Sequence, residues 1–122
     1  MGQKQGIVEV TPLVRSPMDD YLEQFMERKM SYRAGNLRNR GFDLTEDIYE
    51  AVARAMQIMG RSGYPLKHHF KKIYVWDESV GAVQPGWKLS ELAMALTVLN
   101  GPVENPFVSR AQLTLLRRYM DV

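Results

Sequence analysis

One stretch of the chain is apolar on every side of the helix that it is expected to form. In ELAMALTVLN, residues 91 to 100, Thr97 is the lone polar side chain in the middle. Ser90 can cap the start of this stretch, and an Asn-Gly-Pro sequence ends it, because proline cannot continue a helix. A helix without a polar face belongs in the interior of a domain. The sequence therefore predicts a helix over 89–100 around which the other elements pack.

Three further helices are indicated by capping residues followed by apolar residues at helical spacing. They are expected over 16–34, 43–60 and 105–120. Asp43 and Glu46 fit a capping box at the start of the second of these helices. Asn105 precedes a proline at the first position of the last one, where the missing N–H costs no hydrogen bond.

Between the second and third helices the pattern changes to that of strands. KIYVW is β-branched and aromatic, and the DESVG that follows supplies a turn, so we expect a hairpin over 72–83. We interpret 1–15 as an N-terminal arm with a short strand in IVEV. Segment 33–43 contains RAGNLRNRG, which is rich in glycine and asparagine and has Leu37 as its one large apolar side chain, so the segment is expected to be mobile.

These elements, together with the composition, define the expected fold class. The chain has 122 residues, of which 45% are hydrophobic and 25% charged, the profile of one globular domain. We therefore expect a single, mainly α domain over 1–122, a compact arrangement of four helices with a small β-hairpin inserted between the second and third.

The residues give little support to an enzyme or a metal site. The chain has no cysteine, which excludes disulfides and thiolate ligands. Adjacent His68 and His69 point in different directions on a helix or a strand, so they cannot easily share one metal ion. The carboxylates gather in the first turns of the expected helices, where the helix dipole accounts for them. We expect no catalytic residue, no cofactor and no metal.

The chain shows no sign of a membrane partner. Its N-terminus lacks the apolar region of a signal peptide, and its longest apolar run is far shorter than a bilayer span, which needs about 20 residues. A soluble, cytoplasmic protein is expected. The formal net charge of +2 permits a nucleic-acid partner without requiring one.

Two sets of residues are candidates for binding. Basic segments 28–40 and 67–72 favour a nucleic-acid-binding accessory protein as the alternative function, because cations contact phosphates. The candidate contacts in these segments are Arg33, Arg38, Arg40, Lys67, Lys71 and Lys72.

Aromatic residues around the hairpin carry the leading hypothesis. They are Phe70, Tyr74, Trp76 and Trp87. Large amphipathic rings are frequent at protein interfaces. The sequence therefore predicts a non-enzymatic module that binds an unidentified protein or a second copy of itself, which would make it a homo-oligomer.

Overall fold

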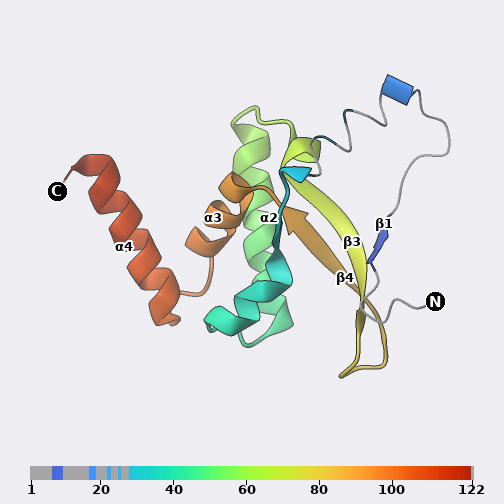
Figure 1. Ribbon diagram of the computed structural model, residues 1–122. Coiled ribbons are helices and arrows are strands. Elements are labelled where there is room, and N and C mark those ends of the chain that lie inside the picture. The colour runs from blue at the N-terminus through green and yellow to red at the C-terminus, as the bar shows by residue number, and fades with distance from the viewer. Residues whose placement is uncertain (1–6, 10–16, 19–21, 23–24, 26–27, 122) are drawn as a thin grey trace.

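The computed structural model describes residues 7–9, 17–18, 22, 25 and 28–121 (Figure 1). Its elements are β1 (Ile7–Glu9), β2 (Tyr32–Arg33), the 3₁₀ helix η1 (Ala34–Arg40), α2 (Thr45–Arg61), the 3₁₀ helix η2 (Leu66–His68), β3 (Phe70–Asp77), β4 (Ala82–Leu89), α3 (Glu91–Leu99) and α4 (Pro106–Met120). Residues 17–18, 22, 25 and 28 are also helical, and the other positions of 16–27 lie outside the described residues. Residues 29–33 are not helical, so the helix expected over 16–34 does not extend to its predicted end.

The four strands form one antiparallel sheet in the order β1-β3-β4-β2. The expected mainly α class with a small hairpin is therefore wrong, and the chain has a mixed α/β fold. β3 and β4 are eight residues long each, longer than the expected hairpin over 72–83. A short strand pairs with each outer edge of this hairpin, and Tyr32 and Arg33, expected at the end of a helix, form one of them.

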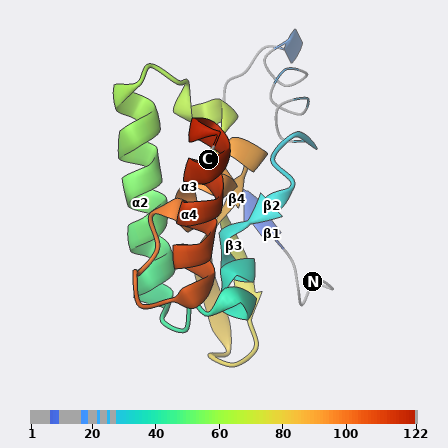
Figure 2. The ribbon, with the colours of Figure 1, turned by 90° about the vertical axis from the view of Figure 1, so that its left-hand side faces the viewer.

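The helices form two layers beside the sheet. α2 and α3 lie next to the sheet, and α4 lies beyond them on the outer side of α3 (Figures 1 and 2). The buried core lies between the sheet and α2, where Phe70 and Leu89 of the hairpin meet the apolar residues of that helix. Phe70 and Leu89 thus fix one end of the hairpin to the helical layer.

The helix at the centre of the core is α2. It buries Ile48, Ala51, Val52, Ala55 and Met59, which share one face of the helix. α3, expected to be central, buries Ala93 and Thr97, while Leu92 is 47% exposed. Thr97 fits into the core because its hydroxyl donates a hydrogen bond to the Ala93 carbonyl at 2.7 Å, so no polar atom is left without a partner.

Segment 33–43, expected to be mobile, is part of the core. It contains β2's last residue and η1, and its apolar side chains Leu37 and Phe42 are 1% and 0% exposed. Gly41 ends η1 with φ of 88°, a conformation that glycine adopts without strain, so the chain can turn from η1 toward α2. Buried side chains hold this glycine-rich segment in place.

The helix ends agree only partly with the capping predictions. Ser90 Oγ accepts a hydrogen bond from Ala93 N, and Asn105 Oδ1 accepts one from Phe107 N, as expected for the two N-caps. The capping box at Asp43 is absent, because Leu44 occupies the N-cap of α2 and no side chain caps it.

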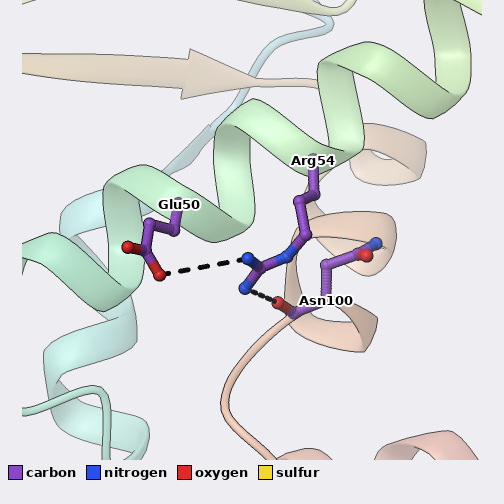
Figure 3. Close-up of polar contacts among 3 residues, drawn as sticks. All are labelled: Glu50, Arg54 and Asn100. Carbon is purple, nitrogen blue, oxygen red and sulfur yellow. Dashed lines mark hydrogen bonds and ion pairs between the residues drawn. The ribbon is translucent and has the colours of Figure 1, made fainter.

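One arginine joins α2 to the end of α3. Arg54 Nη2 donates a hydrogen bond to the Asn100 carbonyl at 2.8 Å, and Arg54 Nη1 lies 3.9 Å from Glu50 Oε1 (Figure 3). A cation at the carboxyl end of a helix is favourably placed against the exposed carbonyls. Arg54 therefore helps to hold the two helices together on the surface.

Candidate interaction surface on the hairpin

The hairpin divides the candidate residues between the two faces of the sheet. Side chains alternate along a strand, and residues paired across two strands share a face. The helix-side face, which begins with Phe70 paired with Leu89, continues with three pairs toward the turn. These pairs are Lys72 with Trp87, Tyr74 with Pro85, and Trp76 with Val83.

The opposite face carries a row of three cations. Lys71 pairs with Lys88, and Lys88 pairs with Arg33 on β2, so the side chains lie side by side across three strands. The Cβ atoms of directly paired residues in such a row are about 5 Å apart. We call Arg33, Lys71 and Lys88 the basic row. Lys88 was not among the candidate residues predicted from the sequence. Pairing the two strands about the DESVG turn would have placed it opposite Lys71.

The other candidate cations lie elsewhere. Lys72 is on the helix-side face, with its Nζ 5.7 Å from the centre of the Tyr74 ring. Arg38 donates a hydrogen bond to Thr45 Oγ1 at 2.7 Å, and Arg40 lies over the Phe107 ring at 5.3 Å. Lys67 is exposed in η2. Of the candidate nucleic-acid contacts, strand pairing therefore brings together Arg33 and Lys71.

The candidate partner-binding residues differ in exposure. Phe70 is 6% exposed and belongs to the core, and Trp87 is partly buried against it. Tyr74 is half-buried and Trp76 is 39% exposed. Val83, at 49% exposure, and exposed Pro85 complete the surface beside them. We call Tyr74, Trp76, Val83 and Pro85 the tip patch.

The turn beside the tip patch is held by its own hydrogen bonds. Asp77 Oδ1 accepts from Ser79 N at 2.9 Å and from Ser79 Oγ at 2.6 Å. The bond from the Ser79 hydroxyl is the main reason that the pKa of Asp77 is lowered. Gly81, with φ of 72°, closes the turn. These contacts give the tip patch a defined shape before any partner arrives.

The edge of β4 is blocked at the middle of the tip patch. Pro85 has no N–H to offer to another strand, and its carbonyl accepts a hydrogen bond from Tyr49 Oη at 3.0 Å. A partner strand therefore cannot add to the sheet at this point. Binding at the tip patch has to use side chains.

His69 is tied to the start of α3. Its Nδ1 lies 2.7 Å from Ser90 Oγ, which also accepts from Ala93 N, and its ring meets Tyr64 edge-on. Which of the two groups donates in this bond depends on the tautomer of the ring. Burial, and secondarily the charge of His68, lowers the pKa of His69. Among the described residues no three His, Asp or Glu side chains gather closely enough to hold a metal ion.

Acidification is expected to destabilise the protein through His69. Its folded-state pKa lies below the ordinary value of about 6.5, so the unfolded chain binds more protons between the two values. The stabilisation is complete above pH of about 6.5 and is lost as the pH falls through the folded-state pKa. Urea unfolding at a series of pH values should show this loss, and His69→Asn should remove it. If the His69→Asn variant lost the same stability on acidification, the loss would be due to groups other than His69.

Comparison with known proteins returned no relative. No family model matches the chain, and neither a curated protein nor a solved structure matches it. Within the described part of the chain, every helix is too short or too polar to cross a membrane. The function has to be inferred from the geometry of the hairpin.

Proposed function

We propose that the chain is a non-enzymatic, cytoplasmic module that binds a protein partner through the tip patch. The observation that carries this proposal is the exposure of Trp76 and Val83, a directly paired apolar couple at 39% and 49%. The same face of the hairpin is buried at its other end, where Phe70 pairs with Leu89. The core therefore covers one half of this face and leaves the aromatic half open.

The chemistry of the tip patch suits a protein partner. Tryptophan and tyrosine bury a large area and have few rotatable bonds to order, so they often dominate binding energy at interfaces. Lys72 and Glu78, both exposed, provide charges of both signs beside the patch. The partner we propose offers an apolar pocket for Trp76 with polar groups at its rim.

Site-specific photo-cross-linking tests this proposal in the cells that naturally make the protein. A benzophenone amino acid at Val83 is expected to give a discrete covalent adduct with one protein. The same group at exposed Glu104 is the matched control and should give none. Adding Trp76→Ser should abolish the Val83 adduct, because it removes the main apolar contact. An adduct of equal yield at both positions, or none at Val83, would contradict the proposal.

The basic row favours nucleic-acid binding as a second candidate function. Arg33, Lys71 and Lys88 form a line of positive charge that fits a single strand of phosphates. Contact with three phosphates predicts that the logarithm of the affinity falls with the logarithm of salt concentration with a slope of about −2 for a single strand.

Fluorescence anisotropy with labelled single-stranded DNA and RNA measures that slope. The double variant Arg33→Gln/Lys88→Gln should reduce it to about −0.7, since one contact remains. Arg61→Gln/Arg110→Gln removes the same charge from α2 and α4 and should leave the slope unchanged. Equal effects of the two double variants would show that only net charge matters. No binding at low salt would remove this candidate.

A further inference from the structure

The second half of α4 carries large apolar side chains that the rest of the domain does not cover. α4 buries Val108, and Gln112 Nε2 donates a hydrogen bond to the Leu99 carbonyl at 2.9 Å, so the first half of the helix is fixed to α3. The exposed apolar residues that follow are Leu113 (61%), Leu115 (42%), Leu116 (53%), Tyr119 (89%) and Met120 (59%). Apolar patches on the order of several hundred Å² mark interaction sites, and these five side chains form one.

Arginines border this apolar surface. Leu113, Leu116 and Met120, at i, i+3 and i+7, lie along one line of the helix, which we call the α4 stripe. Arg110 and Arg117 lie one turn before and one turn after Leu113, so they border the stripe on one side, and both are exposed. α4 contains three arginines and no acidic residue. It is therefore a basic amphipathic helix whose apolar face is open.

α4 is the outermost layer on its side of the molecule. In Figure 1 it lies beyond α3, which separates it from the sheet, and it leans away from α3 toward its C-terminal end. In Figure 2, which is seen from that side, α4 lies in front of α3. A flat surface can therefore approach α4 without first meeting the sheet.

The charges of α4 favour an anionic lipid surface over a second copy of the helix. Two copies packed through the α4 stripe would bring the bordering arginines together, and the one acidic group that follows the helix, Asp121 at its C-cap, would face four of them. A bilayer with anionic lipids supplies acyl chains for the stripe and negative headgroups for the arginines. Arginine can rest its methylene groups on apolar surface while its guanidinium stays in water, and tyrosine favours the same boundary.

We propose that α4 binds the surface of a bilayer that contains anionic phospholipids. The helix lies in the plane of the interface, with the α4 stripe among the acyl chains and Arg110 and Arg117 at the headgroups. The cytoplasmic leaflet carries such lipids. No membrane partner was expected from the sequence, which has no apolar run of bilayer length, but a helix that lies on a bilayer needs no such run. The tip patch takes no part, so this inference is independent of the proposed function.

Vesicle sedimentation with the purified full-length chain tests the charge requirement. The protein should bind vesicles of phosphatidylcholine that contain about 30% phosphatidylserine, more weakly as salt is raised, and should not bind phosphatidylcholine alone. Arg110→Gln/Arg117→Gln should lower the partition coefficient about 25-fold, because each cation near an anionic surface contributes about fivefold. Arg33→Gln/Lys88→Gln is the matched control, which removes the same charge from the sheet and should change the coefficient by less than about twofold.

A second pair of positions tests the insertion of the α4 stripe. Leu116→Ser should weaken binding about tenfold, because the leucine no longer leaves water. Val80→Ser, in the turn between β3 and β4 and 60% exposed, should not. In the cysteine-free chain, a nitrobenzoxadiazole dye on Met120→Cys should brighten and shift to the blue when anionic vesicles are added, whereas the same dye on Val80→Cys should not.

Each other outcome contradicts the inference in a specific way. No binding to anionic vesicles at low salt would show that α4 does not lie on a membrane. An equal loss with Arg33→Gln/Lys88→Gln would assign the binding to net charge or to the basic row. A dimer in sedimentation velocity that Leu116→Ser dissociates, without vesicle binding, would show that a second copy covers α4. Trp76→Ser should leave vesicle binding intact, and a loss in that variant would place the contact on the hairpin.

Discussion

Replacing Leu37 by alanine is expected to lower the free energy of unfolding by about 3 kcal/mol, a typical cost of truncating a buried leucine. Leu37 is 1% exposed and belongs to the core cluster that includes Phe42 and the buried face of α2. The cavity would lie beneath η1, within segment 33–43, whose glycines and asparagines suggest a mobile loop. Urea unfolding followed by circular dichroism measures the change.

Leu92→Ala is the matched control for Leu37→Ala. Leu92 belongs to the most apolar helix of the chain but is 47% exposed, so its truncation should cost less than about 1 kcal/mol. The structure thus predicts that a leucine in a glycine-rich segment matters more than one in an apolar helix. The reverse order would show that α3 is the central element and that 33–43 is a loop.

Gly101→Ala is expected to destabilise the protein by about 2–3 kcal/mol through overpacking. A Cβ at this position would lie 2.5 Å from Phe42 Cζ and 2.8 Å from Val108 Cγ2. Both side chains are 0% exposed, so neither can move aside without disturbing the core. Because Val108 is the buried residue of α4, the added methyl should loosen that helix first. The melting temperature and hydrogen exchange in α4 measure both effects.

Gly35→Ala provides the control for Gly101→Ala. A Cβ at Gly35 would meet nothing within 4 Å, and its φ is not in the left-handed region. The substitution should therefore be neutral or stabilise the protein by up to about 1 kcal/mol, since it restricts the unfolded chain. If Gly101→Ala and Gly35→Ala had the same melting temperature, the close packing of Gly101 against Phe42 would be incorrect.

Local signals in the sequence identified some elements and missed others for a physical reason. Ser90 and Asn105 are recognisable as caps because a cap depends on the few residues around it. β2 is two residues long, too short to show a period, and it forms because Tyr32 and Arg33 pair with residues of β4 far along the chain. The mixed α/β class depends on such distant pairing, so helical spacing alone led to the wrong fold class.

The candidate site was predictable in part. The aromatics and lysines of β3 could be sorted onto two faces by alternation alone, once the strand was recognised. The sequence could not predict which half of the helix-side face stays open. Phe70 belongs to the buried core, whereas Trp76 extends beyond it. That difference depends on where α2 and η1 lie relative to the hairpin, and Val83 and Pro85 became candidates only through their pairing with Trp76 and Tyr74.

Cysteine footprinting of the tip patch tests the central claim most directly. Val83→Cys in the cysteine-free chain should react rapidly with a maleimide in the purified protein, as should Gln57→Cys on α2. In the cells that naturally make the protein, we predict that the maleimide labels Val83→Cys at least fivefold more slowly than in the purified protein. The labelling rate of Gln57→Cys should be unchanged. Equal labelling of Val83→Cys in cells and in the purified protein would show that nothing binds the tip patch, and would contradict the account.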